Sequence, residues 1–122
     1  MELMNYLKWL KMPKSKKDKT IFFEANCLEN NTIYSFEYSN SFFKSVKKHL
    51  KNKEDLLLLC EIIRLFSIDG DLIDKKFKAQ NLIGNYKWFR EAHLKSDLLL
   101  IWKKEENTIY FVILGTHNEL FD

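Results

Sequence analysis

The chain of 122 residues is long enough for one folded domain with a modest hydrophobic core. Its 46% hydrophobic and 15% aromatic residues exclude a wholly disordered chain, because such a composition can bury enough apolar surface to fold. The formal net charge of +3 permits a nucleic-acid partner without requiring one, since solvated lysines are ordinary on protein surfaces.

The sequence carries no sign of membrane insertion or secretion. No apolar run approaches the roughly 20 residues that span a bilayer, and Glu2, Lys8 and Lys11 interrupt the apolar core that a signal peptide would need. Cys27 and Cys60 form neither a CxxC pair nor a metal-binding spacing, so we expect two reduced thiols. These features predict a cytoplasmic protein that does not associate with membranes.

Residues 1–32 are predicted to be an N-terminal extension of the main domain. Residues 2–12 have leucines at helical spacing, and this short amphipathic helix ends before Pro13. The lysine-rich residues 14–19 favour a solvated linker over an arm that grips RNA or a partner. Residues 20–25 have the composition of an additional strand.

The second quarter of the chain predicts one strand followed by two helices. Residues 33–38 are strand-like, and Ser39 or Asn40 is a suitable N-cap for an amphipathic helix that runs to about residue 51. A more apolar helix is predicted over residues 54–66. The short break between the two helices predicts an antiparallel helical hairpin.

The C-terminal third contains three runs of aromatic and aliphatic residues, at 86–93, 97–103 and 108–114, separated by polar breaks. This pattern is typical of an antiparallel meander, with a short hairpin loop at 104–107. We therefore predict an α+β domain over residues 33–122. Its antiparallel sheet would comprise the N-terminal strand and the three-stranded meander, packed on the helical hairpin.

The first predicted helix has an outward face rich in lysine. A phosphate-binding track and an ordinary solvated face are both consistent with this pattern, and the second is the commoner arrangement. His49 lies near the end of this helix and has no acidic neighbour in the sequence, so we expect a structural role for it. The lysines are Lys44, Lys47, Lys48 and Lys51.

Candidate chemistry lies where the C-terminal runs end, at His93, Asp97 and His117. RNA cleavage without a metal needs a base for the 2′-hydroxyl proton, an acid for the leaving 5′ oxygen and a cation for the phosphorane charge. Histidine suits both proton roles because its unperturbed pKa of about 6.5 leaves both forms populated near neutral pH. Spacing alone, however, favours two unrelated surface histidines over a catalytic pair.

The order of residues carries more information than the spacing. The residues concerned are Leu82, Gly84, Lys87, the run Phe89-Arg90-Glu91-Ala92-His93, Asp97, Leu100-Ile101 and the run Gly115-Thr116-His117-Asn118-Glu119-Leu120-Phe121. This order resembles the YafQ branch of the RelE/ParE toxin superfamily. The resemblance covers roughly residues 33–122 and implies a RelE-like fold.

The resemblance implies the toxin of a type II toxin–antitoxin system. Such a toxin is an endoribonuclease that enters the ribosomal A site and cuts mRNA at codons, uses no metal or other cofactor, and leaves a 2′,3′-cyclic phosphate. A cognate antitoxin would hold it inactive in a hetero-oligomer. His93, Asp97 and His117 match the catalytic acid–base residues, with His117 as the general acid, and Phe121 matches an aromatic residue that positions the substrate base.

Three positions depart from the family pattern: Gln80 replaces a histidine, Ile113 an arginine, and Leu98 a tryptophan. Gln80 can hydrogen-bond the substrate but cannot exchange a proton near pH 7. Loss of the arginine removes a positive charge from the developing phosphorane, which by analogy with an oxyanion-hole donor costs about 3–4 kcal/mol.

We expect Gln80, Lys87, Arg90 and Phe121 to bind substrate, and Lys87, Arg90 and Lys103 are the candidates to supply the missing charge. Two alternatives to the active nuclease remain. One is a catalytically degenerate toxin that binds antitoxin or ribosome without cutting. The other is a ParE-like gyrase inhibitor, which is disfavoured because the histidines would then have no purpose.

Overall fold

The computed structural model describes residues 34–68, 73 and 77–121 of the chain. The predicted extension at residues 1–32, with its helix, linker and additional strand, lies outside the described residues. In the described part, no helix is both long enough and apolar enough to cross a membrane.

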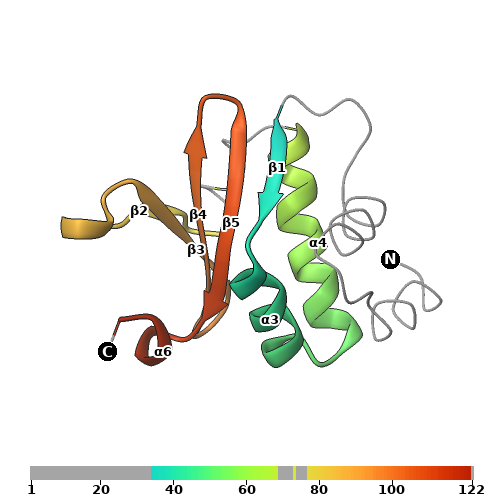
Figure 1. The fold of residues 1–122 in the computed structure, drawn as a ribbon. Coiled ribbons are helices and arrows are strands. Elements are labelled where there is room, and N and C mark those ends of the chain that lie inside the picture. Colours follow the sequence, from blue (N-terminus) through green and yellow to red (C-terminus); the bar gives the residue numbers. More distant parts are fainter. Residues whose placement is uncertain (1–33, 69–72, 74–76, 122) are drawn as a thin grey trace.

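The described part is an α+β structure, as predicted. A five-stranded sheet with the order β1-β5-β4-β3-β2 packs against α3 and α4, while α6 lies beside the end of β5 (Figure 1). The elements are β1 (Ser35–Tyr38), α3 (Asn40–His49), α4 (Lys53–Ile68), β2 (Gln80–Asn81), a 3₁₀ helix (Gly84–Tyr86), β3 (Phe89–Lys95), β4 (Leu98–Glu105), β5 (Thr108–Gly115) and α6 (His117–Phe121).

The sheet differs from the prediction in two respects. First, β1 runs parallel to β5, with Ser35 opposite Thr108, so the sheet is mixed rather than antiparallel throughout. No hairpin joins these two strands, so their relative direction is not fixed by a turn. Second, β2 adds a fifth strand in a stretch expected to be a loop; it pairs with β3 over only two residues, too few for an alternating pattern.

Helix α3 begins at the N-cap and buries the apolar face that the sequence predicted. Ser39 is its N-cap, and the Ser39 hydroxyl accepts a hydrogen bond from the Phe42 amide at 2.9 Å. Phe42, Phe43 and Val46 are fully buried. The ring of Phe42 packs on that of Phe111 in β5, with centroids 5.6 Å apart, so the helix is fixed to the centre of the sheet.

Two serines join α3 to the edge of β5 that β1 leaves uncovered, since β1 accompanies only the first half of β5. The Ser39 amide donates to the Phe111 carbonyl at 3.1 Å, and the Ser39 hydroxyl donates to the Val112 carbonyl. Further along, the Leu114 amide donates to the Ser45 hydroxyl at 2.9 Å. Helix α3 therefore takes over from β1 as the hydrogen-bonding neighbour of β5.

Helix α4 is two residues longer at its C-terminal end than predicted, and it begins after Asn52, whose side chain accepts from the Asp55 amide at 2.9 Å. Cys60 on this helix is disulfide-bonded, so the prediction of a reduced thiol is wrong for Cys60. Its partner lies outside the described residues. Spacing along the chain did not reveal this pairing because it reports neither proximity in space nor oxidation.

The bond between Ser45 and β5 yields a prediction about stability. Ser45 is 7% exposed, and Ser45→Ala would leave the buried Leu114 amide without its acceptor. An unsatisfied buried donor costs about 1–3 kcal/mol, so the free energy of unfolding measured with urea should fall by that amount. Ser41→Ala, on the exposed side of the same helix, is the control and should change it little. Equal effects of the two variants would contradict this role for Ser45.

Candidate active site

The site lies on the face of the sheet that points away from α3 and α4. On β3, Ala92 and Leu94 belong to the core against the helices, so the alternating residues Phe89, Glu91 and His93 point to the other face. A register shift in the pairing of β4 with β5 places Val112 and Ile113 together on this open face.

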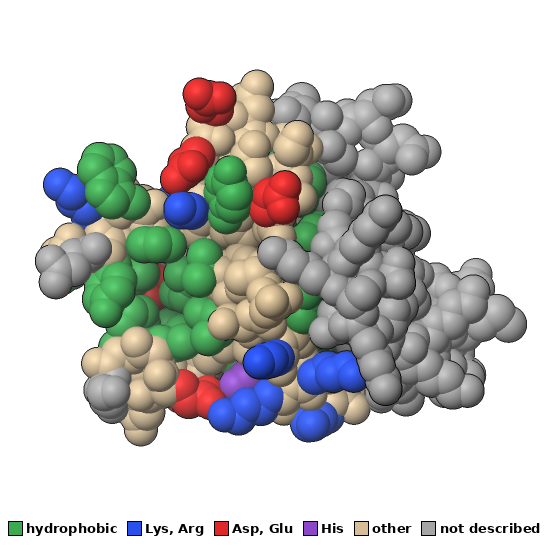
Figure 2. Space-filling view, viewed as in Figure 1, with side chains coloured by type: hydrophobic (Ala, Val, Ile, Leu, Met, Phe, Trp, Pro, Cys, Tyr) green, Lys and Arg blue, Asp and Glu red, His purple; other side chains and the backbone are tan. Residues whose placement is uncertain are grey.

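An apolar groove of about 180 Å³ runs across this open face. Figure 2 shows hydrophobic side chains gathered on this side of the molecule, with acidic and lysine side chains along the lower edge. The groove is open enough to admit part of a larger ligand. It is lined by Leu82, Tyr86, Phe89, Ile101, Val112, Ile113, Leu120 and Phe121.

At one end of the groove, His117 and Asp97 form a bonded pair. Residues Leu99 and Gly115 are paired across β4 and β5, which brings the turn that carries Asp97 next to the start of α6. His117 Nδ1 lies 2.8 Å from Asp97 Oδ1. This side-chain hydrogen bond is the main reason why the pKa of the Asp97 carboxyl lies below its ordinary value. Both side chains are more than half exposed, so a large substrate can reach them.

Three further rings continue the site on either side of His117. The His93 and His117 ring centroids are 6.3 Å apart. On the other side, Phe121 lies 6.2 Å from His117 and 6.4 Å from Tyr86. The Nδ1 atom of His93 is buried and has no hydrogen-bond partner among the described residues. The structure thus brings together His93, Asp97, His117 and Phe121, all predicted from the sequence.

The other predicted site residues are placed differently. Gln80 on the edge strand β2 donates its side-chain amide to Glu91, which is buried beside it. Arg90 points to the opposite face, with its guanidinium 5.8 Å from the Trp102 ring, because it alternates with Glu91 and His93 along β3. Lys87 is exposed, with its ammonium 5.0 Å from the Trp88 ring.

The position at which the family pattern has an arginine is apolar in this chain. Ile113 lies in the groove, opposite Ile101 of β4. Lys103 is on the same face of the sheet as Ile113. It lies four residues along β4 from Leu99, which pairs with His93, and this is roughly 13 Å at the usual rise of a strand. It also forms an ion pair with Glu105 at 3.0 Å. Arg90 and Lys103 are therefore not placed to replace the arginine, and the Lys87 ammonium, among the described residues, is seen only in contact with the Trp88 ring.

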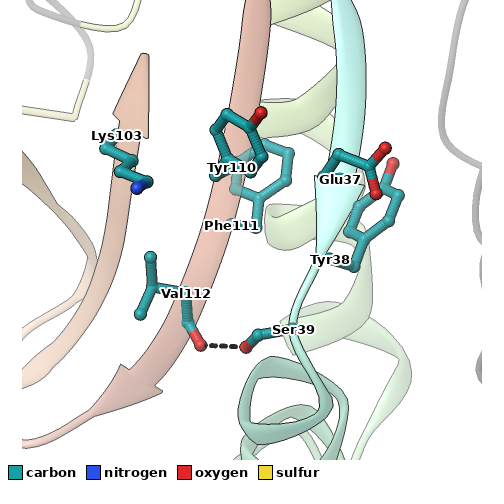
Figure 3. Close-up of a pocket in the computed structure, with 7 residues that line it drawn as sticks. All are labelled: Glu37, Tyr38, Ser39, Lys103, Tyr110, Phe111 and Val112. Atoms are coloured by element: carbon teal, nitrogen blue, oxygen red, sulfur yellow. Dashed lines mark hydrogen bonds between the residues drawn. The ribbon is translucent and has the colours of Figure 1, made fainter. Parts of the chain in front are cut away.

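Lys103 instead borders a second hollow of about 280 Å³, between β1, β5 and β4 (Figure 3). Its ammonium lies 5.2 Å from the Tyr110 ring and 5.9 Å from the Phe89 ring. Glu37 and Tyr110 also line this hollow. The hydrogen bond from the Ser39 hydroxyl to the Val112 carbonyl lies at one end of it. Among the described residues that line this hollow, Lys103 is the one basic side chain.

Sequence reasoning missed three residues of the site. Tyr86 was placed in a strand but not in the site, and Glu91 was not recognised as a buried carboxylate. The third is Glu119, which lies 2.9 Å from His49. Its spacing from Thr116 is that of a helix capping box, which is the signal that could have found it. Within the described residues, no three His, Cys, Asp or Glu side chains are grouped so as to hold a metal ion.

Comparison with known proteins identifies the family of the chain. The family model described as "Bacterial toxin of type II toxin-antitoxin system, YafQ" matches residues 34–122. The mRNA interferase toxin YafQ of Escherichia coli (strain K12) is 32% identical over 85 residues, which are 70% of this chain and 92% of that protein.

Two solved structures extend the match to three dimensions. The crystal structure of YafQ from E. coli strain BL21(DE3) gives a TM-score of 0.60 at 27% identity, over 73% of this chain and 99% of that one. The E. coli DinJ-YafQ toxin-antitoxin complex gives 0.59 at 28% identity, over 74% and 99%. The chain therefore belongs to the YafQ family of toxins from type II toxin–antitoxin systems, and its fold is RelE-like, as the order of its residues predicted.

Proposed function

We propose that this chain is a ribosome-dependent endoribonuclease that cuts mRNA by acid–base chemistry at His93, Asp97 and His117. The observation that carries the proposal is the bonded pair of His117 and Asp97, which faces His93 at the end of the apolar groove. The E. coli relatives at 32% identity are named mRNA interferases, which supports the same class of reaction.

His117 is the general acid in this proposal. Its Nδ1 atom is bonded to Asp97, so the ring is held in one orientation and Nε2 is the nitrogen left for chemistry. Nε2 donates its proton to the 5′ oxygen as the bond from phosphorus to that oxygen breaks. Asp97 acts by orienting the ring, in the way that a carboxylate orients a catalytic histidine in other acid–base sites.

His93 is the general base. It accepts the 2′-hydroxyl proton while the 2′ oxygen attacks the adjacent phosphorus, and the products are a 2′,3′-cyclic phosphate and a 5′-hydroxyl. The two imidazole centroids are 6.3 Å apart, so both rings can face the same phosphodiester group from one side. Phe121 and Tyr86 border the neighbouring groove, where an unpaired base can stack on an aromatic ring.

The chain is proposed to act with an antitoxin, the ribosome and mRNA as its partners. A relative of known structure forms a complex with the antitoxin DinJ, and we infer that a cognate antitoxin binds this chain in a hetero-oligomer. The ribosome and mRNA are the targets in the cytoplasm. Residues 33–122 form the toxin domain, and residues 1–32 are an extension of it.

A second candidate is a toxin that binds antitoxin or ribosome without cutting. Two observations favour it: Ile113 makes the groove apolar where the family pattern has an arginine, and the Gln80 amide is engaged by Glu91. A slower nuclease lies between these two candidates, because the pair of His117 and Asp97 is intact.

Replacing His117 separates the two candidates. We would express residues 1–122 in bacteria and map cuts in an abundant mRNA by primer extension. The wild type should give cuts in phase with codons, and His117→Ala should abolish them together with growth arrest, because the general acid is lost. Asn118→Ala, at the exposed neighbouring position, is the control and should cut normally. Growth arrest that persists in His117→Ala would support the non-cutting toxin instead.

Restoring the missing charge should accelerate cleavage. Ile113→Arg places a guanidinium in the groove at the family position, and a fixed charge on a developing oxyanion changes rates by about 10²–10³-fold. Cleavage rates would be measured on translated mRNA, with Ile113→Gln as a control for length and polarity without charge. If Ile113→Arg cleaves no faster than Ile113→Gln, the missing charge at position 113 does not limit the cleavage rate.

The contact between Asp97 and His117 should be visible in a pH titration. Because the His117 ring favours the carboxylate, the Asp97 pKa should lie below the ordinary value of 3.8. The contribution of this contact to the stability of the folded chain is thus fully present above pH 3.8, and it is lost as the pH falls through the lowered pKa of Asp97. Carboxyl ¹³C NMR should show the Asp97 midpoint rising in His117→Ala but not in Asn118→Ala. An unchanged midpoint in His117→Ala would contradict the contact.

A further inference from the structure

Helix α6 carries His117 and Phe121 but cannot be stable on its own. It has five residues and none of them is buried. Isolated helices need about 12–15 residues to be even marginally stable in water. Contacts outside the helix must therefore hold it in place, and the described residues provide a compact set of them around Glu119.

The carboxylate of Glu119 makes contacts with both of its oxygens. Oε1 accepts from the Thr116 amide at 2.9 Å and lies 2.9 Å from His49 Nε2, while Oε2 is bonded to the Lys48 ammonium. The Glu119 amide in turn donates to the Thr116 hydroxyl at 3.2 Å, which completes a reciprocal capping box. The pKa of Glu119 is lowered to about 2, chiefly by the bond from Lys48.

The two cations come from an element that is itself fixed. Lys48 and His49 form the last turn of α3, whose Ser45 is bonded to β5 and whose apolar face is buried in the core. The Glu119 carboxylate therefore contacts an anchored helix and at the same time caps the helix that begins with His117. This gives a continuous path of contacts from the core to the proposed general acid.

We propose that Glu119, bound by Lys48 and His49, is the positioning residue of the catalytic helix. These three residues form a latch, the Glu119 latch, that keeps α6 folded, so that His117 stays on Asp97 and Phe121 stays beside Tyr86. The inference rests on the proposed function for its activity measurement, whereas its structural measurement is independent of catalysis.

The contacts themselves indicate a local role. The side chains of Lys48 and Glu119 are 65% and 31% exposed, and ion pairs at such exposure contribute little to global unfolding. A short terminal helix, however, can open by itself while the core stays folded. Loss of the latch should therefore release α6 and leave the melting temperature nearly unchanged.

Three variants test the latch. Glu119→Ala removes both the capping box and the contact with α3. Glu119→Gln keeps an acceptor for the Thr116 amide, because glutamine also serves in capping boxes, and should restore part of the function. Glu105→Ala removes an equal charge at the far end of β4, more than half exposed, and is the control.

The activity measurement compares the cleavage rate constant with the apparent affinity for programmed ribosomes. Glu119→Ala should lower the rate constant by up to about 10²-fold, as expected for a displaced catalytic group, and should weaken the apparent affinity by a smaller factor, because Phe121 moves with the helix. Glu119→Gln should fall between Glu119→Ala and the wild type, and Glu105→Ala should match the wild type. A full rate in Glu119→Ala would overturn the proposal.

The structural measurement is amide hydrogen exchange by NMR. Protection of the Glu119 and Leu120 amides, which donate to Thr116, should be lost in Glu119→Ala, while that of the Leu114 amide is retained. Nuclear Overhauser contacts between the His93 and His117 rings should weaken in parallel. Retained protection and ring contacts in Glu119→Ala would overturn the latch.

A double-mutant cycle links the two sides of the latch. If Lys48 acts through Glu119, the exchange rates in Lys48→Ala combined with Glu119→Ala should equal those in Glu119→Ala alone. Fully additive effects would overturn the coupling. If the wild type does not cleave mRNA, the proposed function fails, and the exchange experiments alone still decide whether the latch holds α6.

Discussion

The peptide groups of β5 must find hydrogen-bond partners on both sides of the strand, yet β1 accompanies only its first half. Beyond the end of β1, Ser39 and Ser45 supply the missing partners from the start and the middle of α3. A buried peptide group without a partner is costly, so this arrangement fixes where α3 can lie. The position of α3 in turn decides what stands beside the end of β5, where the candidate site begins.

The site combines two environments that serve different purposes. The groove is almost entirely apolar, whereas His117 and Asp97 at its end are more than half exposed. An apolar groove suits the faces of unpaired bases, and an exposed acid–base pair suits a substrate that is presented by a much larger particle. In the proposed mechanism, Ile113 would favour base binding over charge stabilisation, because it contributes apolar area to the groove where the family pattern has an arginine.

Local features of the fold could be predicted from the sequence, whereas features that depend on distant residues could not. The N-cap of α3 was predictable because Ser39 acts on Phe42, three residues away. The parallel pairing of β1 was not, since no turn relates it to β5. The sequence shows no acidic neighbour for His49, because its partner Glu119 lies at the other end of the domain. Arg90 was predicted to bind substrate together with His93. Alternation along a strand already places the two residues on opposite faces of β3, so the sequence itself argued against this prediction.

The parallel pairing of β1 with β5 also affects how readily different parts of the molecule can form. Ser35 of β1 pairs with Thr108 of β5. The first strand of the described part therefore pairs with the last strand. Contacts this distant in sequence require a large loop to close, which slows folding and makes it cooperative. The contact between His117 and Asp97, by contrast, depends on the antiparallel pairing of β4 with β5, which are neighbours in the sequence. The two side chains can therefore meet before the long loop has closed, whereas the contacts of Glu119 with Lys48 and His49 join residues from opposite ends of the described domain and form only after closure.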